Sequence, residues 1–191
     1  MIKSLIGIQG GMGSFSEQAA NVFIDSHSIN NSKIEYLISS MAVLSAVEAS
    51  DVEYGIFAME NAQGGVVIES IEALAEYRCK ILDMFYITIS QNLLVKKMTK
   101  MDQIDEIHSH QQALRQCKDY LADNFWTKPL VETDDTAEAA RRLSEGKLSK
   151  NIGVIGSQYC ADLYGLEVLE KDIHDLKNNL TLFLAVKKIK E

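Results

Sequence analysis

A short polar stretch near the C-terminus, Asn178-Asn179-Leu180-Thr181, has residue types that could do chemistry on a small molecule. It runs directly into the apolar segment 182–186, which is typical of a buried strand. A buried last strand must insert among strands made much earlier in the chain, so Thr181 would stand at the mouth of a sheet. There its hydroxyl could face a ligand. The alternative is an ordinary turn before an edge strand, with the asparagines as turn formers.

A second candidate is the glycine-rich turn that follows the apolar segment 2–9. The turn, Gly10-Gly11-Met12-Gly13, leads to Ser14, and Glu17 lies three residues further on. This is the spacing of a capping box, so a helix should begin here. The N–H groups and dipole of a helix N-terminus attract a phosphate or carboxylate. A dinucleotide fold is the rival, but Ser16 stands where it needs a third glycine, and the next strand ends without an acid for a ribose.

The order of strand, polar turn and helix is repeated after the strand expected at residues 54–59. Its turn is Glu60-Asn61-Ala62-Gln63-Gly64-Gly65, and apolar residues at helical spacing begin at Val67. In a parallel sheet both turns leave at the carboxyl edge, where α/β proteins bind their ligands. Taken alone, Glu60 could be a surface acid and the two glycines a tight turn.

The arrangement of these segments predicts two lobes. Residues 79–95 are mostly apolar but too long for one ordinary strand, so we interpret them as a crossing between lobes. Strands and helices then alternate again, with strands expected near residues 106–108, 130–133 and 151–155 and a helix from Ser109 to about Asn124. We expect an α/β fold of two lobes around a cleft, with residues 1–78 and 174–191 in one lobe and 79–173 in the other. Such a cleft binds small anions between opposed helix N-termini.

Charge and composition argue against several classes of partner. The formal net charge is -8 over 191 residues, without a long basic run, which disfavours nucleic acid and anionic membranes. No apolar stretch approaches the ~20 residues that span a bilayer, and the N-terminus lacks a signal-peptide core. The scattered cysteines Cys79, Cys117 and Cys160 suit a reducing compartment and make disulfides or zinc unexpected. We therefore expect a cytoplasmic protein.

Two further groupings of reactive side chains have simpler explanations. His108 and His110 could project from one face of a strand as metal ligands, but no acid or cysteine stands at ligand spacing. His110 and Cys117 lie seven residues apart and could form a nucleophile pair, although an amphipathic helix face explains the same spacing. We expect no metal site.

Five blocks, in order along the chain, carry a resemblance to a known family. They are Gly13 to Ala20, Glu60-Asn61 with Gly64 and Val66, Ser109-His110 with Gln112-Ala113-Leu114 and Gln116-Cys117, Thr136 to Ala140, and Asn178 to Phe183. Together they resemble the catalytic domain of prephenate dehydratases over essentially the whole chain. The resemblance implies two α/β lobes like a type II periplasmic binding protein. It also implies a homodimeric lyase that converts prephenate to phenylpyruvate, carbon dioxide and water in phenylalanine biosynthesis, with no cofactor.

The resemblance assigns roles to individual residues. Thr181 would be the general acid or hydrogen-bond donor that helps the ring hydroxyl leave, Glu60 would orient the site, and Asn61 and Ser109 would complete the catalytic set. The substrate-binding residues would be Ser14, Phe15, Ser16, Gly64, Gly65, His110, Gln112, Thr136, Asn179, Leu182 and Phe183. Because prephenate is a dicarboxylate and hydroxide is a poor leaving group, the site needs orientation and one donor more than a strong base.

The last block departs from the family pattern. The family has Thr-Arg-Phe where this chain has Thr181-Leu182-Phe183. The resemblance implies that the arginine binds a carboxylate or orders the site, and Leu182 can do neither through a charge. A charge-assisted hydrogen bond is worth ~1.5–3 kcal/mol, so its loss would weaken substrate binding roughly ten- to a hundredfold. Ala62 also replaces the serine that usually follows Glu-Asn.

These departures leave two other functions open. One is a relative that decarboxylates prephenate but retains the hydroxyl, and the other is a non-catalytic two-lobed module that binds small anions. The regulatory ACT domain that often follows the catalytic domain is not expected in this chain of 191 residues. Feedback by phenylalanine through such a domain is therefore not expected either.

Overall fold

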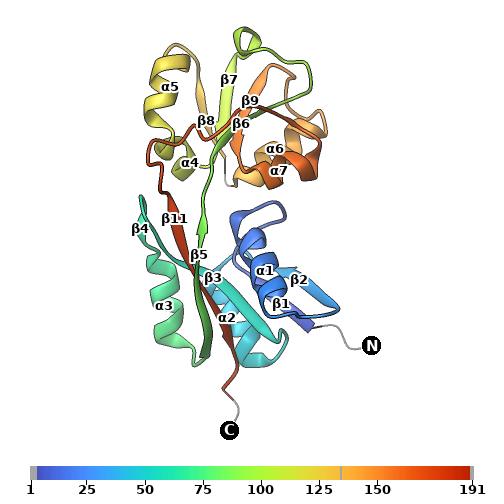
Figure 1. Cartoon of the computed structure of the whole chain (residues 1–191), viewed down its shortest axis with the longest axis vertical. Helices are drawn as coiled ribbons and strands as arrows, with labels where there is room; N and C mark the ends of the chain where they lie inside the picture. The colour runs from blue at the N-terminus through green and yellow to red at the C-terminus, as the bar shows by residue number, and fades with distance from the viewer. Residues whose placement is uncertain (1–3, 134, 190–191) are drawn as a thin grey trace. The chain divides into compact units, whose positions relative to one another are not determined.

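The chain passes from one α/β unit to a second and then returns to the first. The computed structural model describes residues 4–133 and 135–189 (Figure 1). Unit 1 comprises Met1–Thr88 and Leu180–Glu191, and unit 2 comprises Ile89–Asn179. The sequence predicted these divisions near residues 78 and 173. They lie later in the chain because the strand that follows Cys79 pairs along its length with the last strand, and so belongs to unit 1.

Unit 1 is built on one mixed sheet with the strand order β2-β1-β3-β11-β5, and β4 pairs with β3. Its strands are β1 (Ser4–Ile8), β2 (Ser32–Tyr36), β3 (Tyr54–Asn61), β4 (Gly65–Val66), β5 (Lys80–Thr88) and β11 (Leu180–Lys187). Its helices are α1 (Phe15–Ser26), α2 (Ser40–Ala49) and α3 (Ile68–Glu76). Strand β1 is parallel to both β2 and β3, whereas β11 is antiparallel to both of its neighbours.

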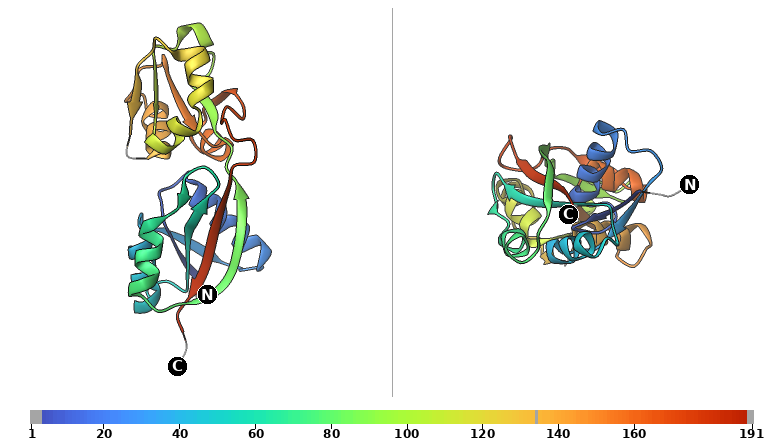
Figure 2. Two further views of the ribbon diagram at one scale, coloured as in Figure 1. Left: turned by 90° about the vertical axis from the view of Figure 1, so that its left-hand side faces the viewer. Right: turned by 90° about the horizontal axis from the view of Figure 1, so that it is seen from below.

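The last strand is inserted into the sheet of unit 1, as its apolar sequence predicts. Figure 2 shows β11 lying beside β5. Side chains of β11 alternate between two cores: Phe183 and Ala185 pack with α1, and Leu184 and Val186 pack with α2 and α3. This alternation is the period-two pattern of a strand buried on both faces.

Unit 2 has a second mixed sheet with the strand order β10-β6-β9-β7-β8. The strands are β6 (Asn92–Val95), β7 (Glu106–Ser109), β8 (Leu130–Glu132), β9 (Ile152–Gly156) and β10 (Glu167–Glu170). The helices are η1 (Met101–Gln103), α4 (Gln111–Gln116), α5 (Lys118–Phe125), α6 (Thr136–Ser144) and α7 (Gln158–Tyr164). Strand β7 is parallel to β8 and β9, so the turns after these strands leave the sheet at one edge.

Two local expectations are corrected by the structure. The long apolar segment 79–95 is two strands, β5 and β6, joined by residues 89–91, and each strand belongs to a different unit. The helix expected from Ser109 to about Asn124 is interrupted at Cys117, which ends α4 and precedes α5. The α/β class is confirmed. None of the helices within residues 4–133 and 135–189 is long and apolar enough to cross a membrane.

Candidate functional site

The glycine-rich turn connects the end of β1 to the N-terminus of α1. Gly10 and Gly13 have φ angles of 125° and 88°, which residues with a Cβ rarely adopt. A Cβ on Gly10 would also lie 2.9 Å from the Ser14 hydroxyl oxygen. Ser14 is the N-cap of α1, and its Oγ accepts a hydrogen bond from the Glu17 N–H at 3.3 Å. Phe15 and Ser16 form the first turn of α1 and are both half-buried.

The buried Glu17 side chain stabilises this turn, but its hydrogen bond is not the one expected in a capping box. The carboxylate accepts the Gly13 N–H at 2.6 Å rather than that of Ser14. The other carboxylate oxygen accepts the Tyr36 hydroxyl at 2.8 Å. The sequence spacing thus identified an important residue but assigned it the wrong bond. Glu17 fixes where the N-terminus of α1 stands relative to the end of β2.

Asn61 and Thr181 meet at the end of the β3–β11 ladder, where they face each other in register. Asn61 Nδ2 donates to Thr181 Oγ1 at 2.8 Å. Asn61 Oδ1 accepts the N–H groups of Gln63 and Gly64 at 3.0 and 2.8 Å. These two backbone donors fix the orientation of the amide, because only its oxygen can accept them. The turn and the hydroxyl are therefore held by one side chain.

The Thr181 hydroxyl accepts a hydrogen bond but has no acceptor for its own proton among the residues that the structure describes. Thr181 is 6% exposed. A hydroxyl carries one donor and two acceptor positions, and the bond from Asn61 occupies an acceptor position. The proton is free to be donated to a bound molecule.

Leu182 and Thr181 lie on opposite faces of β11. Leu182 shares a face with Leu184, which packs against α2 and α3, whereas Thr181 shares a face with Phe183. Leu182 stands directly opposite Glu60 on β3. The register then shifts between Leu182 and Phe183, which makes a β-bulge at Met59. An arginine at position 182 would face Glu60 rather than the Thr181 hydroxyl.

Other predicted binding residues of unit 1 lie in different surroundings. Phe183 is 2% exposed and stacks on Phe85 with ring centroids 6.3 Å apart, so it packs in the core. Gly64 is exposed in the turn after β3, and Gly65 is exposed at the start of β4 with a φ of 74°. Glu60 is exposed at the end of β3.

A polar network behind β3 was not predicted from the sequence. The Gln9 side chain accepts the Ala58 N–H at 3.1 Å and donates to Glu69 at 3.4 Å. Glu69 also accepts the Ser40 N–H at 2.8 Å, and the Ser70 hydroxyl donates to the Ala58 carbonyl at 2.6 Å. The network joins the N-terminal turns of α2 and α3 to β3, just before the bulge. Its residues are far apart in sequence, so no local pattern could reveal it.

In unit 2 the predicted residues Ser109 and Thr136 come together at the carboxyl edge of the sheet. Ser109 is fully buried at the end of β7, and its hydroxyl donates to the Ile155 carbonyl at 3.0 Å. The Thr136 hydroxyl, in the first turn of α6, lies 3.4 Å from the Ser109 hydroxyl. Because the Ser109 proton is used by Ile155, Thr136 is the donor in this pair. Asp135 caps α6 by accepting the Ala137 N–H at 3.0 Å.

The remaining predicted residues of unit 2 have mainly structural contacts. His110 is the exposed N-cap of α4, and its Nδ1 accepts the Gln112 N–H at 3.2 Å. Gln112 is half-buried. Asn179 is fully buried, and its carbonyl accepts the Ile89 N–H at 2.7 Å. This last bond ties together the two segments where the chain enters and leaves unit 2.

The histidine and cysteine groupings make no reactive site. His108 Nε2 lies 2.9 Å from a carboxylate oxygen of Glu106, so a polar atom of this buried ring has a hydrogen-bond partner inside the protein. Within the described residues no group of three histidine, cysteine, aspartate or glutamate side chains is placed to hold a metal ion. Burial, reinforced by Asp175 and opposed by Lys177, raises the pKa of the Cys117 thiol to about 12. A thiol of this pKa is protonated at neutral pH and is a poor nucleophile.

Comparisons with known proteins identify relatives over almost the whole chain. The family model described as "Prephenate dehydratase" matches residues 6–191. A prephenate dehydratase of Methanocaldococcus jannaschii is 33% identical over 180 residues, which are 93% of this chain and 63% of that protein. A bifunctional chorismate mutase/prephenate dehydratase of Buchnera aphidicola is 31% identical over 95% of this chain and 48% of its own length. The chain therefore spans about half to two-thirds of the length of these relatives.

Solved structures with the same fold are also found. A prephenate dehydratase from Arthrobacter aurescens, solved with L-Phe, superimposes with a TM-score of 0.87 at 22% identity, over 98% of this chain and 60% of that one. A nutrient-binding protein from Burkholderia cenocepacia gives a TM-score of 0.53 at 14% identity, over 97% of this chain and 85% of that one. The expected likeness of the fold to prephenate dehydratases and to binding proteins is confirmed.

Proposed function

This chain belongs to the prephenate dehydratase family, and we propose that it converts prephenate to phenylpyruvate in phenylalanine biosynthesis. The observation that carries the proposal is the Thr181 hydroxyl, which Asn61 holds in place while leaving its proton available. The reaction needs one such donor, because the departing ring hydroxyl leaves far more readily as water than as hydroxide.

The proposed reaction is an elimination of water that is coupled to decarboxylation. The bond between the ring and its carboxylate breaks to give carbon dioxide, and its electron pair enters the ring as the ring becomes aromatic. The bond to the ring hydroxyl breaks at the opposite carbon, and this oxygen leaves as water after taking up one proton, which the Thr181 hydroxyl delivers and solvent replaces. Aromatisation supplies the driving force, so no strong base is needed. Thr181 stabilises the oxygen as negative charge develops on it.

We assign the carboxylate-binding role to N–H and hydroxyl groups at helix N-termini. In unit 1 these are Ser14, Phe15 and Ser16 at the start of α1, which is held by Glu17. In unit 2 they are the N-terminus of α6 at Thr136 and the neighbouring Ser109. Both are places where N–H groups and the helix dipole favour an anion. The exposed residues Gly64, Gly65 and His110, with half-buried Gln112, are further binding candidates.

Glu60, Asn179, Leu182 and Phe183 act indirectly in this proposal. Phe183 and Asn179 are buried and support the segments that carry Thr181. Glu60 and Leu182 face each other across the β3–β11 ladder, on the face that Thr181 does not share. We propose that the family arginine orders this end of the ladder by pairing with Glu60. Without the arginine, the Thr181 hydroxyl still stands in place as the hydrogen-bond donor. In this proposal the reaction needs neither a metal nor an organic cofactor.

A homodimer is proposed from an apolar surface on unit 1. Ile68 and Ile71 on α3 and Met84 and Tyr86 on the edge strand β5 are all exposed. Surfaces where exposed apolar side chains gather are typical of protein interfaces. Replacing Ile71 by glutamate is expected to shift the protein from dimer to monomer in sedimentation velocity. A dimer that this substitution leaves unchanged would place the interface elsewhere.

The absence of disulfides among the three cysteines and the negative net charge support the proposal of a cytoplasmic enzyme that acts on small molecules. Cys79, Cys117 and Cys160 form no disulfide, which suits a reducing compartment. The net charge of -8 disfavours association with nucleic acid or an anionic membrane.

The test is to incubate the protein with prephenate and to identify the product by mass spectrometry and by the absorbance of phenylpyruvate in alkali. Phenylpyruvate is the expected product, and Thr181→Val under the same conditions is the control for contaminating enzymes. A decarboxylated product that keeps the hydroxyl would replace the proposal by the hydroxyl-retaining decarboxylase. Saturable binding without turnover would make the chain a non-catalytic anion-binding module.

A further inference from the structure

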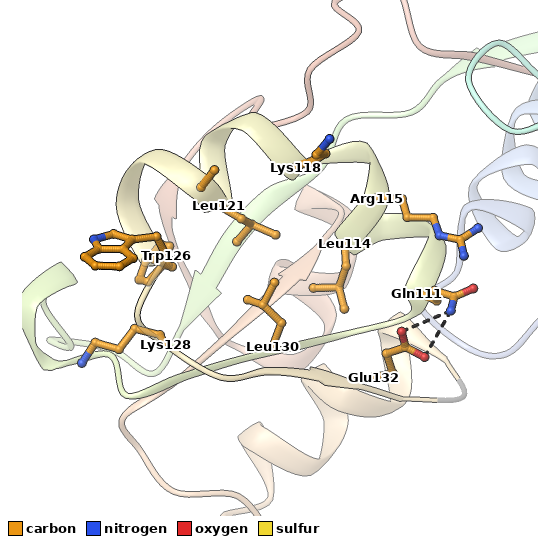
Figure 3. Close-up of a pocket in the computed structure, with 11 residues that line it drawn as sticks. Gln111, Leu114, Arg115, Lys118, Leu121, Trp126, Lys128, Leu130 and Glu132 are labelled. Atoms are coloured by element: carbon orange, nitrogen blue, oxygen red, sulfur yellow. Dashed lines mark hydrogen bonds between the residues drawn. The ribbon is translucent and has the colours of Figure 1, made fainter.

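A groove on unit 2, which none of the predicted site residues lines, has the properties of a separate ligand site. It lies between α4, α5 and the edge strand β8, and has a volume of about 530 Å³ (Figure 3). Small-molecule sites in proteins usually measure about 300–1,000 Å³. None of the candidate site residues described above lines it. We refer to it as the α5 groove.

The floor of the α5 groove is apolar. Leu114, Leu121, Phe125 and Leu130 line it, and Figure 3 shows Leu114, Leu121 and Leu130 directed toward its centre. The first three belong to the core of unit 2, so the floor is rigid. Leu130 on β8 is 46% exposed, and a ligand that filled the groove would cover it. An apolar body fits this floor, since burying apolar surface is favourable.

The rim of the groove is cationic. Arg115, Lys118 and Lys128 line it, and Glu132 is the one acid among its lining residues. The Glu132 carboxylate accepts the Gln111 side-chain amide at 3.2 and 3.4 Å. Arg115 and Lys118 have no acidic partner within the described parts of the chain, and Lys128 reaches Asp105 only at 3.8 Å. In a chain of net charge -8, this local excess of positive charge favours an anionic ligand.

Trp126 lies at one end of the groove and is 81% exposed. An indole this exposed is unusual for a residue type that is mostly buried. A planar ring beside an apolar groove offers a stacking surface to an aromatic ligand. Trp126 is also the only tryptophan in the sequence, so its fluorescence reports on this groove alone.

We propose that the α5 groove binds a small amphipathic anion, with an aromatic or branched apolar body on Leu114, Leu121 and Leu130 and a carboxylate held by Arg115 and Lys118. The size of the groove admits one such molecule. The proposal is independent of the dehydratase activity, because no residue of the groove has a role in that reaction.

The test is a titration of Trp126 fluorescence with 3-phenylpropanoate, with the neutral 3-phenylpropan-1-ol as the matched ligand. For a ligand of this size we expect saturation with a dissociation constant on the order of 1 mM. The alcohol should bind at least about threefold more weakly, because it lacks the charge. Equal quenching by the acid and the alcohol, or quenching by the acid that does not saturate, would overturn the proposal.

Substitutions then locate the site. The double variant Arg115→Gln/Lys118→Gln should weaken binding about three- to tenfold, because it removes the charges that hold the carboxylate. Leu130→Gln should also weaken binding, because it removes an apolar contact with the body of the ligand. Lys97→Gln, which removes an exposed lysine outside the groove, is the matched control and should change nothing. Thr181→Val should leave the fluorescence titration unchanged, so a failed dehydratase assay does not affect this result. Equal effects of the control and the groove variants would contradict the location.

Discussion

The polar ends of the two sheets differ in where their hydroxyl protons go. In unit 1 the Thr181 hydroxyl accepts from Asn61 and has no internal acceptor among the described residues, so its proton can be given to a ligand. In unit 2 the Ser109 hydroxyl donates to the Ile155 carbonyl, and Thr136 donates to Ser109. Hydroxyls at strand ends in the two units are thus suited to different roles. In the function proposed above, unit 1 carries the hydrogen-bond donor for the reaction, and the hydroxyls of unit 2 stabilise the fold beside the proposed anion site.

The largest effect is expected from removing the Thr181 hydroxyl. Thr181→Val keeps the shape of the side chain but deletes the donor, and kcat should fall by about 10²–10⁴, the range for a positioned proton donor. The free energy of unfolding should change by less than about 1 kcal/mol, because a single hydrogen bond from Asn61 is lost. The measurement is steady-state formation of phenylpyruvate together with urea unfolding. Thr181→Ser should recover most of the rate, and a serine variant as slow as the valine variant would argue against the hydroxyl.

Asn61 should show the next largest effect. In Asn61→Asp the new carboxylate can still accept the N–H groups of Gln63 and Gly64, but it would attract the Thr181 proton to itself. We expect kcat to fall about ten- to a hundredfold with little change in stability. Hydrogen exchange of the Gln63 and Gly64 amides measures whether the turn survives. An unchanged kcat with an intact turn would show that the orientation of the Thr181 hydroxyl does not matter.

Ser109 in unit 2 should behave in the opposite way. Ser109→Ala removes the buried hydrogen bond from the Ser109 hydroxyl to the Ile155 carbonyl, which costs about 0.5–1.5 kcal/mol of folding free energy. Activity should change mainly through KM and by severalfold, because the Ser109 proton is not available to the substrate. Urea unfolding and steady-state kinetics test both parts. A loss of kcat as large as that of Thr181→Val would remove the distinction between the two units.

The smallest effect is expected at Leu182. Since this side chain faces Glu60, Leu182→Arg would create a cross-strand ion pair worth about 0.2–1 kcal/mol. KM should fall no more than about fivefold. Leu182→Gln is the matched control, because it adds a polar side chain without the charge. A ten- to hundredfold fall in KM with arginine alone would show that the family arginine contacts the substrate directly.

Local patterns predicted much of this fold. The strand at the C-terminus, the glycine turn and the helix that begins at Phe15 follow from apolar runs, glycines and an N-cap serine, which act over a few residues. The sequence also indicated that Thr181 stands at the mouth of a sheet and that Asn61 lies in a turn after a strand, but their hydrogen bond is known only from the structure. The local features depend on interactions between residues close in the sequence, so the sequence alone is sufficient to predict them.

Features that depend on register could not be predicted. The bulge at Met59 sets which side chains of β3 face Leu182 and Thr181, and it arises only when the distant strands pair. The same is true of the Glu17 carboxylate, whose partners Gly13 and Tyr36 meet only in the folded sheet. Because of this register, an arginine at position 182 would stand opposite Glu60, on the face of β11 that Thr181 does not share. Of the two roles that the resemblance implies for the arginine, this position favours ordering of the site over binding of a substrate carboxylate.

A double-mutant cycle measures whether Asn61 acts through the Thr181 hydroxyl while Ser109 in unit 2 acts independently. We would measure kcat for Thr181→Val, Asn61→Asp and Ser109→Ala and for the two double variants that contain Thr181→Val. We expect that adding Asn61→Asp to Thr181→Val causes little further loss, whereas adding Ser109→Ala reduces the rate by its own separate factor. If the losses from Thr181→Val and Asn61→Asp instead multiply in full, the two residues act separately and the claim is contradicted.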